Sequence, residues 1–138
     1  MNISAHVHNA AGDHRVTVAT GLATQSLAIA AKVEGSGSSV NGGELLMLAL
    51  ATCYCNDVYR EAARMNIEVA SVEVEALGDF DGVGLAAANV RYRARIESPA
   101  SEAEVQALLD RTDAVAEVHN TVRAGVQVVR EPWPGRWT

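Results

Sequence analysis

Alternating apolar and polar positions in the first quarter of the chain predict a small antiparallel sheet. Residues 16–18 alternate directly after the turn-prone segment 11–13, which indicates a hairpin whose first strand lies near residues 3–7. Every second residue over 27–33 is apolar, so a third strand is predicted there. The glycine- and serine-rich residues 35–39 then form a flexible loop that ends this first group of strands.

A long helix is predicted next, from Asn41 to Met65. No proline interrupts this segment, and its Leu, Ala, Met, Glu and Arg residues favour a helix. Asn41 can cap the helix, and Glu44, three positions further on, is its reciprocal partner in a capping-box-like start. Residues 45–53 are apolar on every face of the helix. We therefore expect this half to be buried all round, inside a wrapped sheet or at a subunit interface.

Two more strands follow the helix. Apolar residues over 67–74 change parity near residues 70–71, which indicates a break or bulge in the strand. A turn at residues 79–82 precedes the clearest half-exposed strand, residues 90–97, in which apolar residues face one side. Its other face is polar and is most simply a solvated or intersubunit surface. That face carries Arg91, Arg93, Arg95 and Glu97.

Two short helices and a last strand complete the predicted order. Ser101 and Glu104 form a second capping box, and Thr112 is a candidate cap for the helix after that. Alternation at residues 126–128 predicts a final strand. Because strands and helices are segregated along the chain, the order favours an α+β fold over a doubly wound α/β fold. We expect residues 1–138 to form one domain.

Composition and charge narrow the classes of function. The chain has 138 residues, of which 49% are hydrophobic, and this is enough for one compact core. It has no run of about 18 apolar residues that could span a membrane, and no secretory signal pattern. A net charge of −6, without a cluster of Lys or Arg, argues against nucleic acid or an anionic membrane as partner. Cys53 and Cys55 point to opposite sides of the predicted helix and cannot readily bridge, so we expect a cytoplasmic protein.

Two segments carry a resemblance to a known family. The segment from Gly42, GGELLMLALATCYC, resembles the central-helix motif of the OsmC/Ohr family, in the variant in which Glu-Leu-Leu opens the helix. Residues 116–123, AEVHNTVR, resemble the second motif of that family, which usually begins Cys-Pro and runs through Ser-Asn. The similarity extends over essentially the whole chain. It implies an α+β protein whose sheet wraps around a long buried central helix, in an intertwined homodimer with sites at the subunit boundary.

The resemblance also implies a reaction. Well-studied family members reduce organic or fatty-acid hydroperoxides: one cysteine becomes a sulfenic acid, a second resolves it as a disulfide, and a dithiol restores both. Carried over by position, the attacking cysteine is Cys53, whereas the second cysteine falls on Ala116. An external dithiol or a low-molecular-weight thiol would then resolve the sulfenic acid. Cys55 is more simply a core residue, although a rearranging helix could let it act as the resolving thiol.

The family's remaining catalytic positions are only partly matched. An arginine and a glutamate hold the attacking thiolate in the peroxidases of the family. By its spacing to Cys53, the glutamate position is Gly43, with Glu44 beside it, and Gly42 replaces the proline that usually precedes it. Arg15 is the candidate arginine, without a motif to fix the match. Glu44 is a candidate for the glutamate's role, but it is more simply a helix cap and dipole partner.

Cys53 needs a nearby cation if it is to react as a thiolate. An unperturbed thiol has a pKa of about 8.5, and burial raises it. The field of the helix N-terminus falls off within about one turn and does not reach Cys53. Arg15, Arg123 and His119 are therefore the candidates. His119 takes the place of the second motif's serine, so it could form a thiolate–imidazolium pair with Cys53 or be a purely structural histidine.

The function predicted from the sequence is thiol-dependent reduction of organic hydroperoxides at Cys53. The alternative is a binding module that holds a small hydrophobic or electrophilic ligand in the dimer cleft without turnover. A third possibility is a family member whose thiol is only structural. We expect no cofactor. His6 and His8 share one strand face and could hold a metal as a pair, but no third ligand is evident, so no metal site is predicted.

Overall fold

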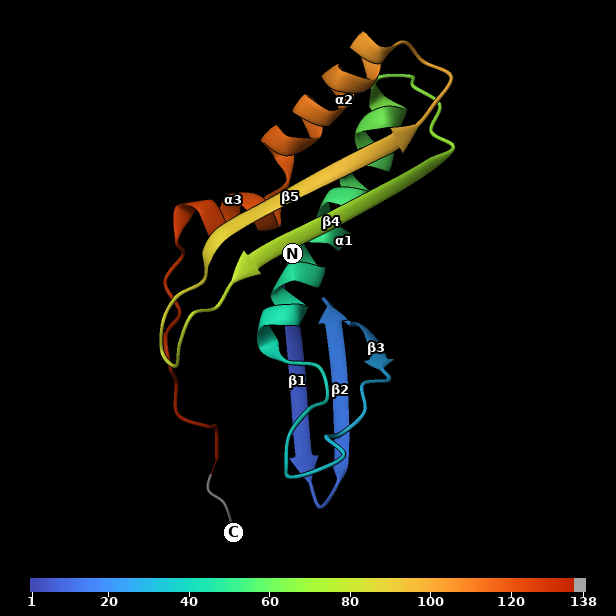
Figure 1. Cartoon of the computed structure of the whole chain (residues 1–138). Coiled ribbons are helices and arrows are strands. Elements are labelled where there is room, and N and C mark those ends of the chain that lie inside the picture. Colours follow the sequence, from blue (N-terminus) through green and yellow to red (C-terminus); the bar gives the residue numbers. More distant parts are fainter. Residues whose placement is uncertain (136–138) are drawn as a thin grey trace. The chain divides into compact units, whose positions relative to one another are not determined.

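The computed structural model describes residues 1–135, which form three helices and two antiparallel sheets (Figure 1). This is a small α+β fold, as the order of elements predicts. The chain divides into two compact units, Met1–Leu46 and Met47–Thr138. Within the described part of the chain, no helix is long and apolar enough to cross a membrane.

The first unit contains the sheet β1-β2-β3, formed by Ile3–Ala10, Asp13–Thr20 and Ala23–Leu27. Ala11 and Gly12 have φ angles of 50° and 79°, the left-handed conformation that a tight hairpin turn requires, so the predicted hairpin is confirmed.

The third strand was predicted in the wrong place: β3 is Ala23–Leu27 and shares only Leu27 with the predicted residues 27–33. Strand β3 ends at Leu27, and over residues 28–33 only Ala31 forms an isolated bridge, to Ser38. Alternation alone was therefore a poor guide here, because a strand also needs a continuous neighbour to pair with.

The long helix is confirmed as α1, Gly42–Arg64. Asn41 Oδ1 accepts a hydrogen bond from the Glu44 N–H at 2.8 Å, and the Asn41 amide donates to Glu44 Oε1 at 2.9 Å. The expectation that residues 45–53 are buried all round is wrong for the single chain, in which Leu48 is 58% exposed. The core of the second unit packs along the later turns of α1, so within residues 45–53 Leu50 is only 3% exposed while Leu48 stays uncovered.

The second unit adds the hairpin β4-β5, Ser71–Asp79 and Ala88–Glu97, followed by α2, Glu102–Val115, and α3, Glu117–Ala124. Its core joins these elements to α1. The buried core residues are Tyr54, Val58, Ala62, Leu108 and Ala116. Partly buried residues of β4 and β5 that pack against them include Val72, Val74, Tyr92, Ala94 and Ile96. The predicted half-exposed strand is therefore confirmed.

Three predicted features of this unit are changed by the structure. The segment 67–69 precedes β4 as a loop, so the predicted break becomes the start of the strand. Helix α2 starts with the predicted capping box at Ser101 but continues through Thr112, whose hydroxyl donates to the Leu108 carbonyl at 2.8 Å. Thr112 therefore caps nothing, since its hydroxyl is satisfied inside the helix. Residues 126–128 form no strand, because no described strand pairs with them.

Candidate functional site

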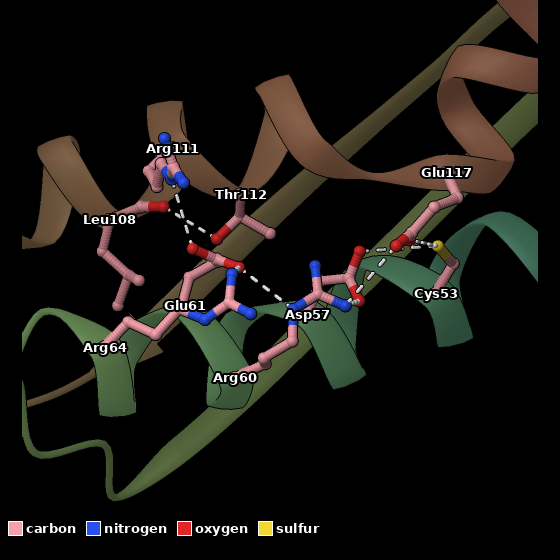
Figure 2. Close-up of polar contacts among 9 residues, drawn as sticks. All are labelled: Cys53, Asp57, Arg60, Glu61, Arg64, Leu108, Arg111, Thr112 and Glu117. Atoms are coloured by element: carbon pink, nitrogen blue, oxygen red, sulfur yellow. Dashed lines mark hydrogen bonds and ion pairs between the residues drawn. The ribbon is translucent and has the colours of Figure 1, made fainter.

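The thiol of Cys53 lies beside two carboxylates. Its Sγ is 3.8 Å from Asp57 Oδ2, one turn further along α1, and 3.9 Å from Glu117 Oε2, at the start of α3 (Figure 2). The sulfur and the two carboxylate oxygens all lie within 4.8 Å of one another. The fold thus brings the second motif to the cysteine of the first, as the resemblance implies.

Arg60 links both carboxylates to a larger charged network. Its Nη1 is 2.8 Å from Asp57 Oδ1 and 3.6 Å from Glu117 Oε1, and its Nε is 3.0 Å from Glu61 Oε1. Glu61 is only 1% exposed and also pairs with Arg64 and with Arg111 of α2, each at 3.2 Å (Figure 2). A buried carboxylate needs such partners, so this network fixes the turn of α1 that carries Asp57.

The surroundings of Cys53 favour the neutral thiol. Burial raises the pKa of Cys53, and the negative charges of Asp57 and Glu117 raise it further, while a hydrogen bond with the backbone of Val118 opposes them. Burial likewise raises the pKa of Asp57, together with the charge of Glu117 and against the pull of Arg60. Hydrogen bonding with its own backbone lowers the pKa of Glu117. The pKa values of the two carboxylates are thus shifted in opposite directions.

His119 is not paired with Cys53. Its side chain packs against the rings of Tyr54 and Tyr92, with ring centroids 5.7 Å and 4.6 Å away, and only 4% of the residue is exposed. Among the described residues, neither ring nitrogen has a hydrogen-bond partner. Burial lowers the pKa of His119, and so does the charge of Arg123, so the surroundings favour the neutral imidazole. Cys53 and His119 therefore form no thiolate–imidazolium pair in the described part of the chain.

The other predicted site residues have local partners. Arg15 lies on β2 in the first unit, where it pairs with Asp13 at 2.7 Å and its side chain stays 77% exposed. Glu44 forms the helix cap described above. Cys55 is a free, partly buried thiol. Arg123 pairs with Asp113 at 2.7 Å.

Sequence reasoning missed Asp57, Arg60 and Glu117. One signal was present: Asp57 stands four positions after Cys53, so both lie on one face of a helix. Glu117 could not be found in the same way, because only the tertiary fold brings α3 to this turn of α1.

The same three side chains are the only cluster of three potential metal ligands among residues 1–135. Cys53, Asp57 and Glu117 offer one sulfur and two oxygen ligands. However, the guanidinium of Arg60 already contacts both carboxylates and supplies the positive charge that a metal ion would bring.

Comparison with known proteins identifies the family. The model of the family described as OsmC-like protein matches residues 35–131, which is more than half of the chain. The chain therefore belongs to the OsmC-like protein family, and the prediction made from the two motifs is confirmed. No curated protein sequence matches it.

Solved structures show the same fold at low sequence identity. An OsmC-like protein from Mycoplasma pneumoniae is 20% identical, with a TM-score of 0.62 over 88% of this chain and 86% of the other. An organic hydroperoxide resistance protein OsmC from Legionella pneumophila is 19% identical, with a TM-score of 0.59 over 89% and 90%. An organic hydroperoxide resistance protein from Elizabethkingia anophelis is 16% identical, with a TM-score of 0.62 over 89% of each chain.

Proposed function

We propose that this protein reduces organic hydroperoxides through Cys53, as a one-cysteine enzyme that an external thiol resolves. The observation that carries the proposal is the contact of the Cys53 thiol with two carboxylates that Arg60 holds in place. Membership of the OsmC-like family and structural neighbours named organic hydroperoxide resistance proteins support the choice of substrate.

Asp57 acts as acid and base in the proposed first step. The sulfur attacks the outer peroxide oxygen, the O–O bond breaks, and Cys53 becomes a sulfenic acid while the peroxide leaves as an alcohol. Asp57 takes the thiol proton and returns it to the departing oxygen. A carboxylate whose pKa is raised is better suited to this exchange at neutral pH than an ordinary one. This route replaces the thiolate held by an arginine that the sequence suggested.

An external thiol completes the proposed cycle. Position 116 carries a fully buried alanine, so the second motif supplies no resolving sulfur. One external thiol displaces water from the sulfenic acid to give a mixed disulfide, and a second thiol, or the other sulfur of a dithiol, releases Cys53 as a thiol. We expect no metal or organic cofactor in this cycle.

We also propose that the chain forms one OsmC-like domain that acts in the cytoplasm as an intertwined homodimer. Two apolar surfaces support the dimer. Leu48 on α1 is 58% exposed, and one face of the first sheet carries Ile3 and Val7, which are 67% and 58% exposed. A second copy of the chain is the simplest cover for surfaces of this kind.

Trapping of the sulfenic acid tests the proposed activity. The protein is treated with cumene hydroperoxide and dimedone, and its intact mass is measured. We expect an adduct in the wild type and in Cys55→Ser, and none in Cys53→Ser. The absence of an adduct in the wild type at every peroxide dose would refute the proposal.

Replacement of Asp57 separates acid–base catalysis from thiolate formation. Asp57→Asn removes a negative charge that raises the pKa of Cys53, so iodoacetamide should alkylate the thiol faster at neutral pH. Peroxide reduction should nevertheless slow by about 10²-fold or more, because the proton shuttle is lost. Asp81→Asn, in an exposed loop, is the matched control. If both rates rose together in Asp57→Asn, Asp57 would have no part in proton transfer.

A further inference from the structure

A second site lies inside the unit Met47–Thr138, between α1, β5 and α3. It is a cavity of about 250 Å³. Leu50, Val90 and Val122 give it apolar walls, and Tyr92 and His119 also line it. Pockets that hold small molecules have this character, with apolar walls and a few polar groups.

The imidazole in the wall of this cavity lacks a polar partner. Among the described residues nothing hydrogen-bonds to either ring nitrogen of His119, although only 4% of the residue is exposed. A buried polar group without a partner costs roughly 1–3 kcal/mol. A neutral imidazole has one N–H donor and one acceptor nitrogen, so a ligand that fills the cavity can supply the missing hydrogen bond.

Arg91 in the cavity wall has no carboxylate partner among the described residues, unlike the next two arginines of the same strand. On the hairpin, Arg93 and Arg95 stand opposite Glu75 and Glu73 and form ion pairs with them. Arg91 stands opposite Leu77 instead.

Arg91 also differs from Arg123, the other arginine in the cavity wall. Its Nη1 donates to the Asn89 carbonyl at 2.8 Å, and no carboxylate pairs with it in the described part of the chain. Arg123 lines the same cavity but is already paired with Asp113. The cavity thus combines apolar walls with one guanidinium that has no carboxylate partner among the described residues.

We propose that this cavity binds a small organic anion with an apolar body and a single carboxylate head. Arg91 pairs with the carboxylate, His119 donates a hydrogen bond to the ligand, and the apolar body lies against Leu50 and Val122. The volume suits a body about the size of benzoate or hexanoate, since it lies just below the range of roughly 300–1,000 Å³ for drug-sized ligands. The lining residues all belong to one chain, and occupation of the cavity requires no redox step at Cys53.

Calorimetry with benzoate and its neutral isostere benzamide tests the proposal on the wild-type protein under reducing conditions. Benzoate should bind at least about tenfold more tightly than benzamide, because a hydrogen bond to a charged group contributes more than a neutral one. Arg91→Gln should remove this preference and weaken benzoate binding by about tenfold. Arg93→Gln, two positions further along the same strand, should leave binding unchanged.

NMR of the histidine rings locates the ligand. The His119 ring signal, assigned by its loss in His119→Gln, should shift on addition of benzoate, whereas the ring signals of His8 and His14 on the first sheet should not. In Val122→Phe, which fills the cavity, both the shift and the binding heat should disappear while the melting temperature is retained. Equal affinity for benzoate and benzamide, equal binding by Arg91→Gln and wild type, or a Kd weaker than about 10 mM would each overturn the proposal.

Discussion

The two compact units of this chain differ most in what they bury. In the second unit, Tyr54, Val58 and Leu108 are at most 2% exposed and belong to a core shared by α1, α2 and the β4-β5 hairpin. In the first unit, Val16 is the only buried apolar residue among those described, and every residue of β1 is exposed. Both units alternate apolar and polar positions along their strands, so the pattern alone does not account for this difference.

The difference in burial between the two units comes from helices that cover the β4-β5 hairpin. Strands β4 and β5 direct their apolar face toward helices of the same unit, which remove it from water. Pairing in the first sheet places Val7 and Val16 opposite each other, and Val16 opposite Leu27, so this sheet also has an apolar face. Because little of this face is buried within the first unit, the sheet gains less stability from apolar burial than the second unit does.

The largest expected effect follows from the core of the second unit. Leu108→Ala should lower the free energy of unfolding by about 2–5 kcal/mol, because it leaves a cavity among fully buried neighbours. Leu22→Ala, at a fully exposed turn of the first unit, should change it by less than about 0.5 kcal/mol. Urea denaturation measures both. Similar losses for the two variants would remove the contrast between the units.

A smaller effect is expected from a partly buried polar contact of the second unit. The Tyr92 hydroxyl donates to Asp113, which Arg123 also holds. Tyr92→Phe should cost about 1.5–3 kcal/mol, the value of a hydrogen bond to a charged group.

The matched change in the first unit is Arg15→Ala, which removes an exposed ion pair with Asp13 and should cost less than about 1 kcal/mol. Thermal unfolding of both variants checks the difference. A loss for Arg15→Ala as large as that for Tyr92→Phe would mean that the first unit depends on this surface pair.

The proposed dimer gives the third prediction, on the uncovered face of the first sheet. Val7→Lys places a charge on the apolar face and should raise the dissociation constant of the dimer by about tenfold or more. Ser4→Lys, on the opposite face of β1, is the control and should have little effect. Sedimentation equilibrium measures the change. Unchanged association in Val7→Lys would show that another surface covers this face or that the chain is monomeric.

The two helix caps give the smallest expected effect. Ser101→Ala removes the capping box of α2 in the well-packed unit and should lower the free energy of unfolding by about 1 kcal/mol. Asn41→Ala removes the cap of α1 at its solvent-exposed start. Here we expect mainly faster amide hydrogen exchange at residues 44–46, with little change in global stability. Equal global losses would indicate that both units unfold together.

The sequence predicted the local structure where a single signal was sufficient. The hairpin turn at Ala11-Gly12, the cap at Asn41 and the capping box at Ser101 each depend on residues within a few positions of one another. The strands predicted at residues 28–33 and 126–128 are wrong, because the alternating pattern is present there but no neighbouring strand pairs with it. The prediction that Thr112 caps a helix is wrong for a related reason, because a threonine hydroxyl can also donate to a carbonyl inside a helix.

For the candidate site, too, some features were predictable from the sequence and others depend on the tertiary structure. The motifs by themselves determined the family, the position of Cys53 and the absence of a second-motif cysteine, because these are properties of residue identity and spacing. Only the tertiary structure decided what surrounds the thiol. Packing of α3 against α1 places Glu117, rather than His119, beside Cys53, and it directs the His119 ring toward two tyrosines. The electrostatics of a thiol depend on groups within a few ångströms of it, and those groups come from segments 64 positions apart in the chain.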